Sequence, residues 1–160
     1  MTSLISYGTG SEPDDSEDSE TITNNDFWPD IEPADFVVVE RIDSSATPAR
    51  IKTALQIAIT DVNRQLADWQ AAQIAKGHES HESVDAPVWA ISDHFQTLYL
   101  RAVYATAKAT LLERYRDQSA TPGGDNSGQA KDEAADDYRR DARWAVCDIE
   151  GKPHSTVELI

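Results

Sequence analysis

The stretch TPARIKTALQIAITDVNRQLADWQAAQIAKG (residues 47–77) predicts a helical fold, because its apolar residues recur at the three-and-four spacing of one helical face. The members of this stripe are Ile51, Leu55, Ala58, Ile59, Val62, Leu66 and Trp69. Thr47 can cap the first turn, and Pro48 suits the first helical position, where a missing N–H costs nothing. Gly77 is typical of the residue just beyond a helix. The pattern predicts a single helix over 48–76, about 43 Å long.

Two later stretches also carry helical patterns. From 92 to 118, apolar residues cover most of the circumference, which is typical of a helix that lies centrally or faces both the core and a neighbouring subunit. From 131 to 150 a single face is apolar, and Gly151 with Pro153 predicts where that helix ends. The segments expected to be loops are 78–87 and 121–128.

A shorter helix is predicted before these three. Asp30 can cap a helix over 34–41, although the run Phe36-Val37-Val38-Val39 could equally form a strand. Together the patterns predict an all-α fold: a helical bundle of three main helices plus a short N-terminal helix, with disordered or extended tails. The expected regions are an acidic flexible arm over 1–26, a helical domain over 27–151 and a C-terminal docking tail over 152–160.

The charge of the chain is strongly negative and unevenly spread. Asp and Glu number 29 against 14 Lys and Arg, a formal net charge of −15. Residues 1–40 hold 11 of these acids and no Lys or Arg. This balance argues against a surface that grips DNA or an anionic membrane, since both require clustered cations. The segment 8–26 holds one large aliphatic residue, Ile22, which is too little apolar area to offset the entropy of ordering.

The sequence predicts no enzyme, because no set of reactive residues converges. The cluster His78-Glu79-Ser80-His81-Glu82 matches no established metal-ligand spacing and is expected to be a solvated loop. His94 and His154 are expected on the surface. The single cysteine, Cys147, lies in an apolar stretch and is interpreted as a small buried hydrophobe. We therefore expect no catalytic, cofactor or metal site, and neither a secretory signal nor an apolar run of about 20 residues is visible.

Binding has more support than catalysis. Arg114 and Tyr115 close the second long helix, and Arg143 and Trp144 mark the last one; these residue types dominate interface hot spots. Alternatively, Arg114 and Arg116 complement the negative end of the helix dipole, and Trp144 fills the core. The candidate interaction residues are Arg50, Arg114, Tyr115, Arg143, Trp144, Lys152, Pro153, Val157, Leu159 and Ile160.

Four separated blocks of the chain resemble the head completion protein of temperate contractile-tailed phages. The blocks are FWPDIEPADF (27–36), the stretch 47–77, LYLRAVYATAKATLLERYRD (98–117) and RRDARWAVCDIEGKPHSTVELI (139–160). Their order and spacing match over about 130 residues, while residues 1–26 fall outside the resemblance.

The resemblance implies a structural virion protein made in the host bacterial cytoplasm. Such a protein joins the portal vertex of the DNA-filled head, stabilises it and provides the surface to which the tail attaches. The implied partners are the portal protein, further copies in a ring that is expected to be twelve-fold, and the next tail or neck component. Packaged DNA would pass through the channel without specific binding, and no membrane is involved.

The residues leave two further hypotheses open. The acidic arm could oppose ring formation away from the head by charge repulsion, or it could simply keep the protein soluble. The alternative function is an acidic helical interaction module, or a nucleic-acid mimic, that binds a basic partner.

Overall fold

The computed structural model describes residues 20–116 and 125–154. Five α-helices and one short 3₁₀ helix follow one another in these two ranges. They are α1 (Pro33–Val39), α2 (Pro48–Gln65), α3 (Ala67–Ala75), η2 (His81–Ser83), α4 (His94–Arg116) and α5 (Asp125–Glu150). The predicted all-α fold is confirmed, and the run 36–39 is helical.

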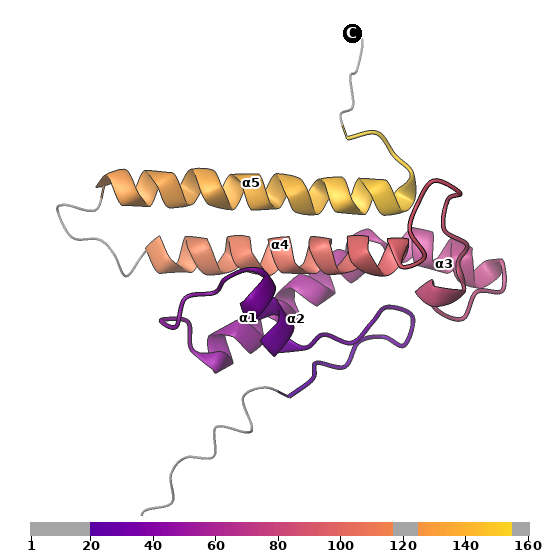
Figure 1. Cartoon of the computed structure of the whole chain (residues 1–160), viewed down its shortest axis with the longest axis horizontal. Coiled ribbons are helices and arrows are strands. Elements are labelled where there is room, and N and C mark those ends of the chain that lie inside the picture. The colour runs from indigo at the N-terminus through magenta and orange to yellow at the C-terminus, as the bar shows by residue number, and fades with distance from the viewer. Residues whose placement is uncertain (1–19, 117–124, 155–160) are drawn as a thin grey trace, which may run out of the picture.

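The helix α4 lies at the centre of the molecule. It packs antiparallel to α5 on one side and against α2 on the other, while α1 crosses the outside of α2 (Figure 1). Its buried residues cover most of its circumference, as the apolar pattern predicts; they are Tyr99, Ala102, Val103, Tyr104, Ala105, Ala107, Ala109 and Leu111.

The long helix predicted over 48–76 is divided into α2 and α3. Its start is confirmed, since Thr47 accepts a hydrogen bond from the Arg50 N–H and Pro48 is the first helical residue. The division lies at Leu66, whose ψ of 3° departs from helical geometry although its side chain is fully buried. The bend carries Trp69 against the Trp28 ring at a centroid distance of 5.6 Å.

Other predicted boundaries also shift. The helix α5 begins at Asp125 rather than 131, so the backbone of 125–128 is helical and not part of a loop. The helix α1 begins with Pro33 after Glu32, and Asp30 does not cap it. Asp30 instead accepts the Asn24 N–H at 2.8 Å and so ties down the segment before the helix.

Residues 20–26 belong to the folded body, contrary to the predicted arm over 1–26. Ile22 is 7% exposed and forms an antiparallel bridge with Ile31, with N–H to O distances of 2.8 and 3.0 Å. The Asn24 amide donates to the Tyr99 hydroxyl at 2.8 Å, Tyr99 donates to Asn63 at 2.7 Å, and Asn63 donates back to Asn24 at 2.9 Å. This closed ring of hydrogen bonds ties the segment to α2 and α4. Residues 1–19 lie outside the described residues.

The segment 78–87 is also less solvated than predicted, because His81 is buried. The Phe27 carbonyl accepts from the His81 backbone N–H at 3.0 Å and from its Nδ1–H at 2.7 Å. The imidazole stacks on Trp28 at 5.8 Å, and Trp28 stacks on Tyr99 at 4.5 Å. Aromatic rings therefore hold the N-terminal segment, η2 and α4 together at this end of the bundle.

Candidate interaction surfaces

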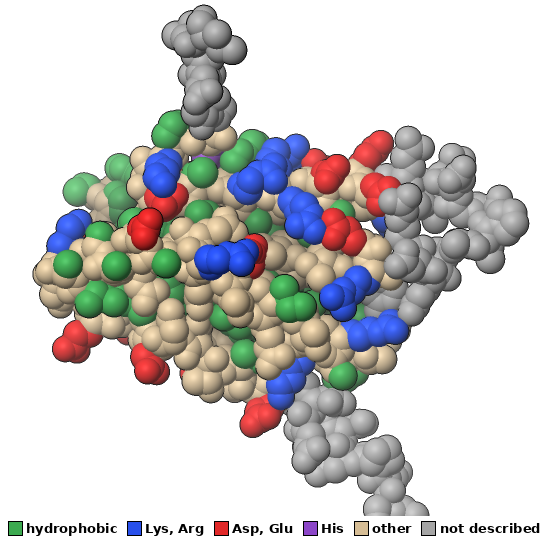
Figure 2. Space-filling view, turned by 180° about the vertical axis from the view of Figure 1, so that it is seen from behind, with side chains coloured by type: hydrophobic (Ala, Val, Ile, Leu, Met, Phe, Trp, Pro, Cys, Tyr) green, Lys and Arg blue, Asp and Glu red, His purple; other side chains and the backbone are tan. Residues whose placement is uncertain are grey.

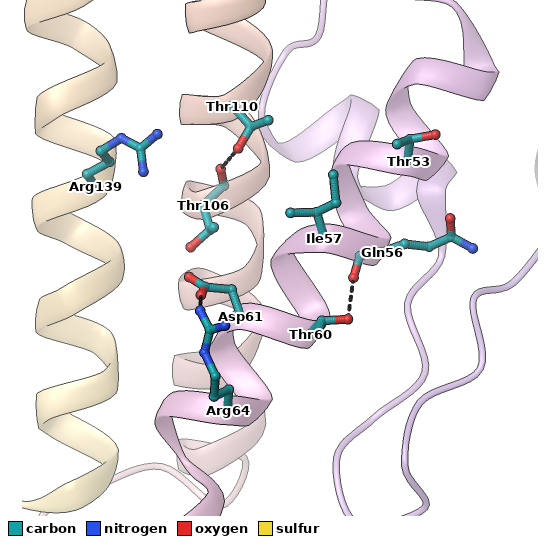
Figure 3. Close-up of a pocket in the computed structure, with 9 residues that line it drawn as sticks. All are labelled: Thr53, Gln56, Ile57, Thr60, Asp61, Arg64, Thr106, Thr110 and Arg139. Carbon is teal, nitrogen blue, oxygen red and sulfur yellow. Dashed lines mark hydrogen bonds and ion pairs between the residues drawn. The ribbon is translucent and has the colours of Figure 1, made fainter.

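A groove lies where α2, α4 and α5 meet (Figure 3). We call it the threonine groove, and its free volume is about 530 Å³. Its lining residues are Thr53, Gln56, Ile57, Thr60, Asp61, Arg64, Thr106, Thr110 and Arg139. Ile57, at 45% exposed, is the apolar side chain of this lining.

The groove opens on the side of α4 that faces away from α1. On the α1 side, the Tyr104 ring contacts Phe36 at 5.3 Å and Lys108 Nζ donates to the Glu40 carbonyl at 2.9 Å. Thr106 and Thr110 lie about half a turn round the helix from these residues, because each residue adds about 100°. The groove is therefore separate from the contacts that hold α1 in place.

The threonines of the groove already use their hydroxyl donors within their own helices. Each hydroxyl donates to the carbonyl four residues earlier, a common arrangement for threonine inside helices. The acceptors are Ala49 at 2.9 Å, Gln56 at 3.0 Å, Ala102 at 2.8 Å and Thr106 at 3.0 Å, for Thr53, Thr60, Thr106 and Thr110 in turn. The threonines can therefore contribute mainly methyl groups to contact with a guest.

Two arginines border the threonine groove, and both are paired. Arg139 donates to both carboxylate oxygens of Glu113, at 2.9 and 2.6 Å, and this hydrogen-bonded pairing raises the pKa of the Arg139 guanidinium. Arg64 pairs with Asp61 one turn away on α2. The pairs hold two planar guanidinium groups at the edge of the groove, where they can stack on an aromatic guest.

A short apolar loop stands out at the end of the molecule that carries α3. Its residues are Val88, Trp89, Ala90 and Ile91, and we call Val88–Ile91 the apolar loop. Val88 is fully exposed, Trp89 is 81% exposed and Ile91 is 64% exposed. Figure 2 shows hydrophobic side chains gathered at this end of the surface. Single exposed apolar residues are ordinary, but adjacent ones are typical of interaction sites.

The apolar loop is held in a defined shape. The Ala90 N–H donates to the Pro87 carbonyl at 2.8 Å, and the His94 N–H donates to the Ile91 carbonyl at 3.2 Å. The indole of Trp89 meets the His94 ring edge to face at 5.4 Å. Two turns and one ring contact therefore orient Trp89, although its side chain remains exposed to solvent.

The C-terminal end of α5 forms a third exposed feature. Gly151, with a φ of +69°, ends the helix as predicted. The His154 ring stacks on Trp144 at 5.0 Å, and its Nε2 pairs with Asp148. The Arg140 guanidinium lies 5.0 Å from the same indole. These contacts hold residues 152–154 against the last turns of α5.

Among the residues that the structure describes, no group of three or more His, Cys, Asp or Glu side chains could hold a metal ion. In the same residues no helix is both long and apolar enough to cross a membrane.

Comparison with known proteins identifies the family. A model described as phage head completion protein (GPL) matches residues 22–160. The chain is 34% identical over 153 residues to the head completion/stabilization protein of Escherichia phage P2, covering 96% of this chain and 90% of that protein. The chain belongs to the phage head completion protein family. It is also 29% identical over 143 residues to the probable head completion/stabilization protein of Haemophilus phage HP1, covering 89% of this chain and 94% of the relative. No solved structure matches it significantly.

Membership of the head completion family confirms the predicted resemblance. It gives the chain a structural role in completing the phage head and makes it a component of the virion. The matched region begins at residue 22, five residues before the block predicted to start the resemblance. The burial of Ile22 and the hydrogen bonds of Asn24 explain this earlier start.

Only some of the candidate interaction residues predicted from the sequence lie close together in this head completion protein. Trp144 does not fill the core, as the alternative proposed; it is half-buried and lies beside the start of the C-terminal tail. Lys152 and Pro153 are exposed there, and Glu150 raises the pKa of the Lys152 ammonium by pairing with it at 2.9 Å. Arg143 is exposed on α5.

The remaining predicted residues are dispersed. Arg50 is exposed in the first turn of α2, and Arg114 is exposed near the end of α4 that lies away from Trp144 (Figure 1). The side chain of Tyr115 and all of Val157, Leu159 and Ile160 lie outside the described residues.

Three histidine and cysteine predictions have mixed outcomes. His154 is exposed as expected, whereas His94 is half-buried between the rings of Trp89 and Phe95. Cys147 is partly exposed rather than buried.

Neither the threonine groove nor the apolar loop was predicted from the sequence. A signal for the loop exists, since four apolar residues lie between Pro87 and Ser92, outside any helical period. A weaker signal for the groove is the pair Thr106 and Thr110, four residues apart on a helix whose apolar residues cover most of its circumference.

Proposed function

We propose that this head completion protein assembles as a ring on the portal of the DNA-filled head, stabilises the packaged DNA and provides the surface to which the tail attaches. The observation that carries the proposal is the position of the two ends of the described chain. Residue 20 lies on the α2 side of the body, whereas residue 154 lies beyond α5 on the opposite side (Figure 1). Segments that leave a subunit on opposite sides suit a protein that joins two layers of a virion.

The C-terminal segment 152–160 is the proposed portal-binding element. Its first residues are held by the Trp144–His154 stack, so the described chain ends at a fixed point on α5. Val157 and Leu159 alternate in the remaining residues and could add as a strand to a partner sheet edge. A tail that starts from a fixed point loses less entropy on docking than one that starts from a mobile end.

A ring follows from the geometry of cyclic assemblies. Each copy then uses two different faces, one for each neighbour. The portal would bring the copies together, so contacts that are weak between free subunits become strong collectively. We expect twelve copies around the portal axis, with DNA passing through the channel without specific binding and the next neck component on the outer side of the ring.

Electron microscopy of the protein mixed with the portal assembly of its phage tests the proposal. The expected result is added ring density in the portal's symmetry. A chain that ends at Gly151 should lose this density and keep its helical circular dichroism, while a chain with residues 155–160 in scrambled order controls for composition. Unchanged binding by the shortened chain would contradict the docking role of the tail.

The role of the acidic arm can be tested by deleting it, and the structure changes where that deletion should end. Because Ile22 and Asn24 belong to the folded body, a deletion that tests charge repulsion must stop at residue 19 rather than 26. If repulsion opposes assembly away from the head, the shortened protein should form rings in solution at low salt. Identical behaviour of the two proteins would leave solubility as the role of the arm.

The alternative function, an acidic module or nucleic-acid mimic that binds a basic partner, predicts a different result in the same experiment. The protein would then stay monomeric beside the portal and form a one-to-one complex with a basic protein.

A further inference from the structure

We propose that the apolar loop Val88–Ile91 of one copy docks into the threonine groove of the next copy, with Trp89 as the anchor. This inference rests on the proposed ring, for which it names the lateral contact. Each copy would present the loop to one neighbour and the groove to the other.

The apolar loop has the properties of an anchor before it binds. Trp89 is 81% exposed, yet its indole is oriented by the His94 ring at 5.4 Å and its backbone by the turn that the Pro87 carbonyl closes. An exposed side chain that is already oriented loses little further entropy on binding. Tryptophan is also the residue most enriched at the energetic centres of protein interfaces.

The threonine groove has the matching properties of a receptor. Its volume of about 530 Å³ is enough for an indole and a neighbouring aliphatic side chain. Its threonine hydroxyls already donate to backbone carbonyls, so an apolar guest would leave no hydroxyl donor unpaired. Ile57 adds exposed aliphatic surface to the lining.

The charges around the two surfaces are compatible in a strongly acidic chain. The segment 77–93 that carries the apolar loop has four acids and no Lys or Arg: Glu79, Glu82, Asp85 and Asp93. The groove is bordered by two ion pairs, Arg64 with Asp61 and Arg139 with Glu113, so these groups add no net negative charge although the chain as a whole carries −15. An acidic segment is therefore repelled less here than at an acidic patch, and the flat guanidinium groups can stack against the indole.

The proposed occupant is a second copy, because the loop and the groove of one chain lie too far apart to meet and the proposed ring places identical copies side by side. Thr106 lies twelve residues along α4 from His94, about 18 Å at 1.5 Å per residue. No residue of the apolar loop lines the groove of its own chain. Two different patches that fit each other on one subunit make a head-to-tail contact, which gives a ring when the rotation between neighbours closes, as it would on a symmetric portal.

A cysteine-pairing experiment tests the contact. In a Cys147→Ser background that keeps the Trp89 anchor, one preparation carries Val88→Cys and the other carries Thr106→Cys. The two are mixed and mildly oxidised, both on portal-bearing heads and in concentrated solution. We expect disulfide-linked dimers from the mixture and far fewer from either preparation alone. The matched control pairs Thr106→Cys with Val38→Cys, whose side chain on α1 is also exposed to solvent, and should give no dimers.

A second variant separates this inference from the proposed function. Trp89→Asp should weaken self-assembly at least tenfold, while Val38→Asp should leave it unchanged. If the wild-type protein forms rings on heads but no dimers link Val88→Cys to Thr106→Cys, and Trp89→Asp still forms rings, the lateral contact is wrong and the proposed function stands. If the wild-type protein does not bind heads, the proposed function fails. Disulfide-linked dimers in concentrated solution would then still support the lateral contact. The absence of those dimers would overturn the lateral contact as well. The Trp89→Asp variant could also form rings and fail only to bind the next neck component. That result would show that the loop binds the neck component and not a second copy, which also overturns the inference.

Discussion

Two tryptophans at the same end of the molecule have opposite environments. Trp28 is 2% exposed and stacks on Tyr99, Trp69 and His81, whereas Trp89 is 81% exposed. They are nevertheless linked by an unbroken run of ring contacts. From Trp89 the rings follow through His94, Phe95 and Trp69 to Trp28, at centroid distances of 5.4, 5.1, 5.1 and 5.6 Å.

The difference shows how this end of the bundle separates stability from interaction. Residues 20–26 pack beside Trp28, and hydrogen bonds among Asn24, Asn63 and Tyr99 hold them there. Among residues 20–116 and 125–154, none covers the Trp89 side chain in this way, although its backbone is held by turns. We therefore expect substitutions in the first region to affect folding and substitutions in the second to affect assembly.

The largest expected effect is that of Trp28→Ala. Removing a buried indole that contacts four other rings should lower the free energy of unfolding by about 3–5 kcal/mol. Chemical denaturation followed by circular dichroism measures the change. Trp28→Phe is the matched control, because it keeps an aromatic ring and removes an indole N–H that has no hydrogen-bond partner among the described residues. A loss for Trp28→Ala no larger than that for the phenylalanine variant would contradict the assigned role of the buried ring.

A strong dependence of stability on alkaline pH is the next expected effect. Burial raises the pKa of Tyr99 to about 12, from 10.0 in an exposed phenol. Below pH 10 both states keep the proton; above it the unfolded chain loses the proton first, so unfolding becomes favoured until the folded phenol also ionises near pH 12. The loss attributable to Tyr99 should approach ~2.7 kcal/mol, since one pKa unit corresponds to about 1.4 kcal/mol.

Denaturation midpoints measured across this pH range test the linkage. The matched variant is Tyr99→Phe, whose stability is lower at neutral pH but should fall less steeply as the pH rises. Tyr104, whose pKa burial also raises to about 12, keeps part of the dependence in that variant. Equal slopes for the two proteins would show that Tyr99 is not the linked group.

The sequence predicts the helices well because their signals are local. The Thr47–Pro48 start and the glycines at 77 and 151 each act within one turn, and the structure confirms them. The division at Leu66 has no such signal, since leucine favours helices and continues the apolar stripe. It is imposed by the packing of Trp69 on Trp28, a contact between residues far apart in the chain.

The candidate surfaces are harder to predict because they depend on tertiary arrangement. The lining of the threonine groove comes from three helices, and the hydroxyl of a threonine can turn inward or outward without any change in the sequence pattern. Residues 20–26 are acidic and poor in apolar side chains, yet the buried Ile22, its bridge to Ile31 and the hydrogen bonds of Asn24 join them to the body. Composition is informative about the average of a segment, whereas these contacts depend on single residues and their distant partners.

Asn24→Ala should have an intermediate effect. Its loss leaves the Tyr99 hydroxyl and the Asn63 amide each without one partner, and we expect a destabilisation of about 2 kcal/mol. Hydrogen exchange should also accelerate at the Ile22 N–H, which donates to Ile31 at 2.8 Å in the bridge next to Asn24. Thr23→Ala is the control, because Thr23 is exposed and lies directly between Ile22 and Asn24 in the chain. Unchanged exchange at Ile22 in the Asn24 variant would show that the bridge holds the segment by itself.

The smallest effect on stability is expected for Trp89→Ser, within about 0.5 kcal/mol of wild type, because the indole is almost entirely in water in the free subunit. The same denaturation experiment used for Trp28→Ala measures it, which makes the two tryptophans directly comparable. The His94 ring contact is the one feature that could make the substitution costly, so His94→Ala in the same series isolates its contribution. A loss for Trp89→Ser of more than ~1 kcal/mol would mean that the run of rings from Trp89 to Trp28 acts as one structural unit. Trp89 would then belong to the hydrophobic core. Of the exposed side chains in the apolar loop, only Val88 and Ile91 would remain as candidates for assembly.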